Sequence, residues 1–218
     1  MSNVHEIDVE QVASRAQRAE TLSVLRETYR DEKHWIDDES TVFPIEDLDN
    51  EHVAWFLATS RGQPAGVLRV HYAPPLHLYR QYNLKMTTPG IDVEGFINEN
   101  AIAEIGRFAV VPKQRRHLKI VAALMRAATA DTIARGFTHY ITDVFEGETH
   151  SPYHFHTRVF GFTPVATHEV GEMNCANRRI TLILNLREAY HRLAGRRNRV
   201  FRSITEGWDE QLHKRLSA

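Results

Sequence analysis

The sequence predicts an α/β fold in which a mixed central sheet is flanked by helices. Three observations lead to this prediction: strand-like runs alternate with helical periods, no repeat or linker divides the chain, and 42% of its 218 residues are hydrophobic. A chain of this length forms one large or two small domains and needs no disulfide or metal to support its core. The composition excludes collagen-like and disordered chains.

The first half of the chain predicts a helix, a β-hairpin and a long loop. Apolar side chains recur every three or four positions over residues 11–31, as in an amphipathic helix. The runs 52–59 and 65–72 have the composition of strands, and a Gly- and Pro-containing turn joins them. Residues 76–100 show no clear period, so we expect an irregular insertion with a short helix at 76–82.

The second half predicts a central strand, a long helix and further strands. The apolar run Ala101–Val111 contains two charged residues, Glu104 and Arg107, and ends before a proline. A helical stripe covers Arg116–Arg135. The remaining expected elements are strands at 139–145, 162–170 and 179–186, and a short helix at 150–160 that ends at Gly161. The sheet should therefore hold about six or seven strands.

The C-terminal stretch predicts a kinked or two-part helix. Apolar residues recur every four positions from Val200 to Leu216, and Gly195 and Gly207 interrupt the helical pattern. We expect a domain over 1–186 and a helical extension over 187–218 that packs on it.

Charge and cysteine content narrow the class of protein. The 27 Lys and Arg residues balance 28 Asp and Glu residues, so net charge gives no argument for nucleic-acid binding. No apolar run approaches the ~18 residues of a membrane span, and the charged N-terminus is unlike a signal peptide. The lone Cys175 cannot form an internal disulfide, which favours a reducing compartment. These features predict a soluble, cytoplasmic protein.

A basic turn joins the central strand to the long helix. Its cations are Lys113, Arg115, Arg116 and Lys119. Because a helix N-terminus offers unpaired amides, this turn could bind phosphate. The alternative is an ordinary exposed basic turn.

With the order of elements included, residues 52–186 resemble the GNAT acyltransferase superfamily, whose late strand opens on a Gly-Phe pair such as Gly161-Phe162. The resemblance implies no tightly bound cofactor and an acyl-phosphopantetheine thioester, acyl-CoA or acyl carrier protein, as co-substrate. It implies that the strand residues Phe108, Ala109 and Val110 pair with pantetheine and that the basic turn holds the pyrophosphate. The chain departs from the family's loop pattern, because Lys119 and Val121 occupy positions that usually carry small residues, and it has Thr157 where many acetyltransferases have a tyrosine acid.

Both departures fit better in a smaller branch of the superfamily, which the chain resembles: the acyl-homoserine lactone (autoinducer) synthases and the long-chain N-acyl amino acid synthases. The shared features are Tyr29 followed six residues later by Trp35, an acidic cluster at 43–49, Arg69 late in the hairpin, and the E-x-x-R-F motif at 104–108. The segment from His150 to the Gly-Phe pair looks more like the N-acyl amino acid synthases. The resemblance implies N-acylation of an amino acid or related small amine.

The resemblance also implies roles for single residues. Glu104 is expected to be the general base, because an amine attacks a thioester only after losing its proton; the alternative is a structural partner of Arg69 or Arg107. Arg69 and Arg107 would orient a carboxylate or brace the acidic cluster, and Trp35 would cover the site. His150 would lie near the acyl carbonyl.

Two alternatives remain open: acetyl-CoA-dependent N-acetylation, and a GNAT-shaped binding or regulatory module without turnover. No metal is expected, since the histidines at 150, 154 and 156 lack the other ligands of a zinc site. An acidic acyl carrier protein is the expected donor. It would dock on the basic turn, and the C-terminal arginines 192, 196, 197, 199 and 202 would extend that patch if the segment folds back.

Overall fold

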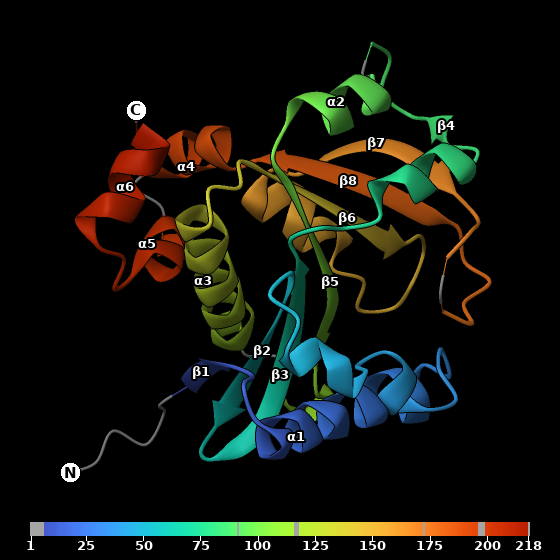
Figure 1. Ribbon diagram of the computed structural model, residues 1–218, viewed down its shortest axis with the longest axis vertical. Coiled ribbons are helices and arrows are strands. Elements are labelled where there is room, and N and C mark those ends of the chain that lie inside the picture. The colour runs from blue at the N-terminus through green and yellow to red at the C-terminus, as the bar shows by residue number, and fades with distance from the viewer. Residues whose placement is uncertain (1–6, 91, 116–117, 172, 196–198, 218) are drawn as a thin grey trace.

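The computed structural model describes residues 7–90, 92–115, 118–171, 173–195 and 199–217 (Figure 1). These residues form one eight-stranded mixed sheet in the order β1-β2-β3-β5-β6-β8-β7-β4. The strands are β1 (Ile7–Gln11), β2 (Val53–Ser60), β3 (Gln63–His71), β4 (Lys85–Met86), β5 (Ile102–Val110), β6 (His139–Phe145), β7 (Thr163–His168) and β8 (Arg179–Asn185). The expected number of six or seven strands was too low because β1 and the two-residue β4 are short edge strands without a long apolar run.

Helices and helical turns connect the strands. The α-helices are α1 (Arg15–Leu25), α2 (Val93–Glu99), α3 (Leu118–Ala134), α4 (Leu186–Gly195), α5 (Arg199–Thr205) and α6 (Glu210–Ser217). Wider π-helical turns cover Arg26–Glu32 and Phe155–Phe160, and 3-10 turns cover Glu39–Thr41, Ile45–Leu48, Leu76–Gln81 and Pro112–Gln114. The helix expected at 11–31 is therefore shorter and continues as a π-helical turn, and the insertion expected to be irregular contains β4 and α2.

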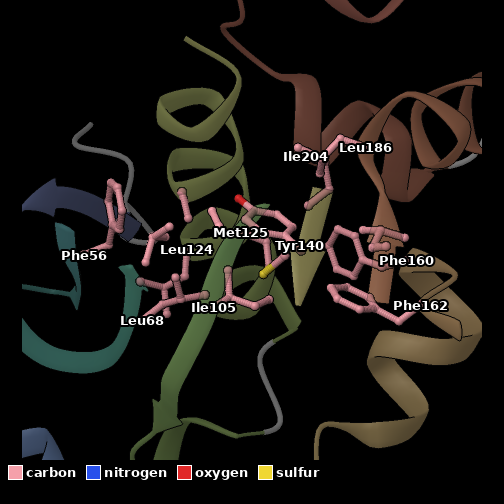
Figure 2. Packing of buried hydrophobic residues seen from close by; sticks show 14 of the residues in the cluster. Phe56, Leu68, Ile105, Leu124, Met125, Tyr140, Phe160, Phe162, Leu186 and Ile204 are labelled. Carbon is pink, nitrogen blue, oxygen red and sulfur yellow. The ribbon is translucent and has the colours of Figure 1, made fainter. Parts of the chain in front are cut away.

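Alternating side chains on the strands bury both faces of the sheet. On β2, Phe56 faces the core that contains α3, whereas Trp55 faces the core that contains α1. Figure 2 shows the α3 side, where Leu124 and Met125 of the helix lie against Leu68 and other sheet residues. On the opposite face, α1 and the π-helical turn after it cover β2, β3 and β5, while the insertion and α2 cover β6, β7 and β8 (Figure 1). A cavity lies between these two groups of helices and turns, next to β5 and β6.

The sheet splits between β5 and β6. These parallel strands pair only from Ile102 to Glu104, opposite residues 139–141. Beyond that point β5 continues to pair with β3 as far as Val110, and β6 with β8 as far as Phe145. Figure 1 shows the two strands diverging beyond their paired residues.

A bulge bends β5 at the split. Arg69 of β3 pairs with Gly106, whereas Val67 pairs with Ala109, so Arg107 and Phe108 together face one residue of β3. Such an extra residue breaks the strict alternation of side chains and increases the local twist. Arg107 has φ of 51°, a left-handed conformation that is uncommon for a residue with a side chain. The bulge therefore explains how charged residues three apart on β5 both line one cavity.

The C-terminal helices pack on the middle and far end of α3. Arg126 of α3 contacts Glu206 at 2.6 Å, and Arg215 of α6 donates to the carbonyls of Ile133 and Ala134 at 2.7 and 2.6 Å. Arg215 therefore caps carbonyl groups that the end of a helix leaves without partners. The helix break expected at Gly207, which has φ of 77°, is present. No helix among the described residues is long and apolar enough to span a bilayer.

The α3 side of the core should carry much of the stability. Leu124 is fully buried, so Leu124→Ala should lower the free energy of unfolding by about 2–5 kcal/mol through lost burial and a residual cavity. Leu118→Ala makes the same change in the first turn of the same helix, where the side chain is 68% exposed, and should change stability by less than about 0.5 kcal/mol. Urea unfolding measures both, and equal losses would contradict this account of the core.

Candidate active site

A cavity of about 480 Å³ occupies the split between β5 and β6. This volume lies within the roughly 300–1,000 Å³ of typical small-molecule sites. Its walls are Glu104–Val110 of β5, Thr142–Phe145 of β6, Tyr29 and Trp35, the loop 148–152, Tyr79 and Tyr82 of the insertion, and Arg69 and His71 of β3. The sequence-predicted residues Glu104, His150, Trp35, Arg69, Arg107, Phe108, Ala109, Val110 and Arg115 all line it.

An ion pair lies at the point where the split begins. Nη2 of Arg69 donates to Oε1 of Glu104 at 2.8 Å, and the two side chains are only 16% and 20% exposed. A Cβ at Gly106 would lie 3.6 Å from both Nη2 of Arg69 and Oε1 of Glu104. The pair therefore stands directly beside the backbone of the bulged strand. Both roles considered for Glu104, proton acceptor and partner of Arg69, are compatible with this placement.

Tyr29 closes the bulged side of the cavity. Its hydroxyl donates to the carbonyl of Phe108 at 3.3 Å. Burial raises the pKa of Tyr29 to about 12, and the nearby charges of Arg107 and Arg69 oppose part of that rise. Tyr29 therefore stays protonated near neutral pH and remains a hydrogen-bond donor to the bulge.

Trp35 crosses the split. Its ring centroid lies 5.4 Å from that of Tyr29 on the β5 side and 4.5 Å from that of Phe145 on β6. Lys33, two residues before Trp35, pairs with Glu148 and donates to the carbonyl of Thr149 at 2.7 Å. The segment from Tyr29 to Trp35 is thus fastened to both halves of the sheet, and Trp35 lines the cavity between them. That Trp35 covers a bound substrate stays a prediction.

The three clustered histidines occupy different environments. His150 is exposed at the cavity wall with φ of 64°, and His154 is exposed and outside the wall. His156 is buried in the wall, within ring contact of Phe108 and Phe162, and burial lowers its pKa to about 3. Among the described residues no group of three His, Cys, Asp or Glu side chains is placed to hold a metal ion.

The basic turn does not form the four-cation cradle that the sequence suggested. Lys113 and Lys119 are exposed and do not line the cavity. Arg115 lines it, but its guanidinium donates to the carbonyl of Val110 at 3.0 Å and holds Glu32 at 2.6 Å. The fourth predicted cation, Arg116, lies outside the described residues.

The C-terminal arginines do not extend this turn, which corrects a further expectation. Arg192 donates to the carbonyl of Val159 at 3.0 Å, and Arg199 and Arg202 belong to α5, which packs beside the middle of α3 rather than its first turn. Arg196 and Arg197 lie outside the described residues. The direction of the chain after β8 explains the difference, because α4 starts directly at the end of that strand.

Sequence reasoning missed two further carboxylates in the cavity, Glu148, which pairs with Lys33, and Asp143. Asp143 of β6 accepts from the hydroxyl of Thr181 at 2.8 Å and from that of Tyr79 at 3.3 Å, and Nε2 of His168 lies 3.2 Å away. Tyr79 is buried, and burial followed by the charges of Asp143 and Glu104 raises its pKa well above the ordinary value. The available signal was an acidic residue inside a strand of apolar and aromatic residues, where unpaired charge is unfavourable.

Comparisons with known proteins agree with this geometry. Residues 16–162 match the model of the acetyltransferase (GNAT) family. The solved structure of FeeM, an N-acyl amino acid synthase from uncultured soil microbes, has a TM-score of 0.63 at 14% identity, covering 86% of this chain and 94% of that one. An aminoglycoside 6'-N-acetyltransferase complexed with coenzyme A has a TM-score of 0.56 at 11% identity, covering 82% and 97%. The ribosomal-protein-S18-alanine N-acetyltransferase from Escherichia coli has a TM-score of 0.57 at 11% identity, covering 83% and 94%.

No curated protein sequence matches the chain. The split sheet, the cavity within it and the family match together define an acyltransferase. The chain belongs to the GNAT family and is an N-acyltransferase of that superfamily.

The environment of His156 predicts how acid affects the fold. Its pKa in the folded protein is about 3, below the ~6.5 of an unfolded histidine, so the unfolded chain takes up more protons between these values. Stability should fall as pH drops below about 6.5, by at most about 1.4 kcal/mol per pH unit from this residue. When the pH is lowered from 6.5 to 4, the free energy of unfolding measured in urea should fall less for His156→Gln than for wild type. A ring resonance of His156 that titrates near pH 6.5 would contradict the prediction.

Proposed function

We propose that this enzyme transfers a fatty acyl group from a phosphopantetheine thioester to the amine of an amino acid or related small amine. The observation that carries the proposal is the Glu104–Arg69 pair at the start of the split, inside a cavity that both strands line. Glu104 is a proton acceptor, Arg69 is a cation that can bind a carboxylate, and the backbone of β5 beyond Glu104 has no hydrogen bonds to β6. All three lie at the start of the split.

The residues suggest a direct transfer. Glu104 takes a proton from the acceptor's ammonium, directly or through one water, which frees the nitrogen lone pair to attack the thioester carbon. Arg69 and Arg107 hold the acceptor's carboxylate. Backbone amides of β5 beyond Glu104, where the strand has separated from β6, stabilise the developing oxyanion. Attack forms the C–N bond, and collapse of the tetrahedral intermediate then breaks the C–S bond. The second proton of the nitrogen passes to the leaving sulfur, so that the thiol departs protonated, and Glu104 releases the first proton to solvent. No covalent enzyme intermediate is required.

Apolar side chains favour a long acyl chain over acetyl. Ile105, Phe108, Val121, Val144 and Phe155 all line the cavity. Each buried CH₂ group gains about 0.8 kcal/mol, so a fatty chain can use this wall, whereas acetyl presents a single methyl group to it. Acetyl transfer from coenzyme A remains the second candidate, because the fold is shared with an acetyltransferase complexed with coenzyme A.

Lipid products distinguish the two reactions. Cells that express the wild-type protein should contain long-chain N-acyl amino acids by mass spectrometry of lipid extracts. Purified Glu104→Gln should lose about 100- to 10,000-fold in kcat through the missing base. Glu99→Gln makes the same change at an exposed site and should keep wild-type activity. Acetylated amines as the sole product of a broad amine screen would favour the second candidate, and no acylated product at all would contradict both.

The proposed donor is an acyl carrier protein. Lys113 is exposed in the 3-10 turn before α3, and the exposed Lys119 and the 68% exposed Leu118 lie in the first turn of that helix, where Leu118 lines the cavity. A carrier protein is acidic and presents one phosphate on its arm, so it suits a basic rim and does not need the small residues that Lys119 and Val121 replace. Arg115 is already held by Glu32, so that among the described residues of the turn Lys113 and Lys119 are the cations proposed for docking.

Charge reversal tests this donor. The double variant Lys113→Glu, Lys119→Glu should raise KM for the acyl carrier protein by about 10-fold or more, because docking charges act on the association rate. The effect should shrink with added salt, and short acyl-pantetheine substrates should be used as well as by wild type. Saturable use of acyl-CoA at micromolar concentration with no response to carrier protein would contradict the proposal.

A further inference from the structure

Asp143 differs from the other carboxylates that line the cavity. Among the described lining residues, Glu104 pairs with Arg69 and Glu148 pairs with Lys33. Asp143 instead contacts two hydroxyl groups, those of Thr181 and Tyr79, and the imidazole of His168, and none of these carries a fixed positive charge. The guanidinium of Arg179, a lining residue that lies two positions before Thr181 on β8, donates to the carbonyls of Glu169 and Met173.

Two hydroxyl hydrogen bonds hold the Asp143 side chain in place, and neither donor carries a positive charge. Its side chain is 24% exposed, which leaves part of the carboxylate open to the cavity. The hydroxyls of Thr181 and Tyr79 occupy one oxygen each, at 2.8 and 3.3 Å. A carboxylate that is mostly withdrawn from water and fixed by neutral donors attracts a cation from the ligand, since its charge is otherwise poorly compensated.

Asp143 faces the same part of the cavity as the proposed base. Glu104 is paired with Ile141, and Asp143 lies two residues further along β6, so the two acidic side chains leave the sheet on one face. Strand geometry puts their Cα atoms at least about 8 Å apart, which leaves room for a small group between the side chains. The acceptor amine must enter this space to reach both Glu104 and a thioester laid along β5.

Aromatic rings complete the wall beside Asp143. Tyr79 and Tyr82 line the cavity with ring centroids 5.3 Å apart, and the hydroxyl of Tyr79 donates a hydrogen bond to the carboxylate of Asp143. Aromatic faces are negative and attract ammonium groups, an effect that grows where water is excluded. The anionic group and the rings together form a surface that suits an organic cation better than a neutral or anionic group.

We propose that Asp143 is the counter-ion for the acceptor's ammonium group, and that it selects acceptors that enter the cavity as cations. The inference rests on the proposed function and extends it by naming a binding residue on β6. The acceptor would then lie with its ammonium between the two strands, near Asp143, and its carboxylate toward Arg69 and Arg107. From this position Glu104 removes the proton, so binding and deprotonation are divided between two carboxylates.

A matched pair of ligands tests the proposal without turnover. Isothermal titration of the enzyme, in the absence of thioester, compares an accepted amino acid with the 2-hydroxy acid of the same carbon skeleton, which lacks the ammonium. Asp143→Asn should raise Kd for the amino acid by about 10- to 100-fold, the range expected for a lost hydrogen bond to a charged group, and should leave Kd for the hydroxy acid almost unchanged. Asp8→Asn, the same change at an exposed site on the edge strand β1, should affect neither ligand.

Kinetics gives a second reading in the same variants. Asp143→Asn should raise KM for the acceptor with little change in kcat, whereas Glu104→Gln should mainly lower kcat. Equal loss of both ligands, or no change for the amino acid, would overturn the role of Asp143. If the wild-type enzyme acylates amines that carry no carboxylate, the proposed acceptor class is wrong, and the same comparison with that amine and its matching alcohol still decides the role of Asp143.

Discussion

Strands β5 and β6 are parallel neighbours that share backbone hydrogen bonds only up to Glu104, and the rest of the site depends on this separation. Each strand keeps a partner on its other side, β3 for β5 and β8 for β6, so neither loses its place in the sheet. Two half-sheets therefore bound the cavity on two sides, and the segment with Trp35, the insertion and the loop 148–152 complete its walls. Residues on the strands are held more precisely than residues on mobile segments, which suits a reaction that depends on the position of an amine relative to a thioester.

Two local features adapt β5 to this position. The bulge at Arg107 and Phe108 inserts one extra residue opposite β3 and changes the face to which the following side chains point. The absence of a side chain at Gly106 leaves space that Arg69 and Glu104 border at 3.6 Å. A left-handed residue such as Arg107 is energetically unfavourable outside glycine, and such conformations gather at functional sites. The strand that would hold the donor thus contains both a bulge and a left-handed residue.

Charge in the cavity is arranged by pairs. Three ion pairs join segments that are distant in the sequence: Glu32 with Arg115, Glu148 with Lys33, and Glu104 with Arg69. The first two pairs fasten the segment around Trp35 to opposite sides of the split, so that this segment closes one end of the cavity. Asp143 belongs to a different environment of hydroxyl groups and an imidazole, which is why its charge is available to a ligand.

The sequence by itself determined the order of most elements, the family and a set of charged residues around the E-x-x-R-F motif. These follow from local patterns, because period and turn composition depend on neighbours along the chain. The short edge strands β1 and β4 and the π-helical turns carry no such pattern. Only the tertiary structure decided which charges meet: that Arg115 is held by Glu32, that the C-terminal arginines pack beside α3, and that Asp143 shares a cavity with Glu104. Which charged side chains meet across strands and across the split depends on strand register and on the bulge. Neither can be predicted from the spacing of residues within one strand.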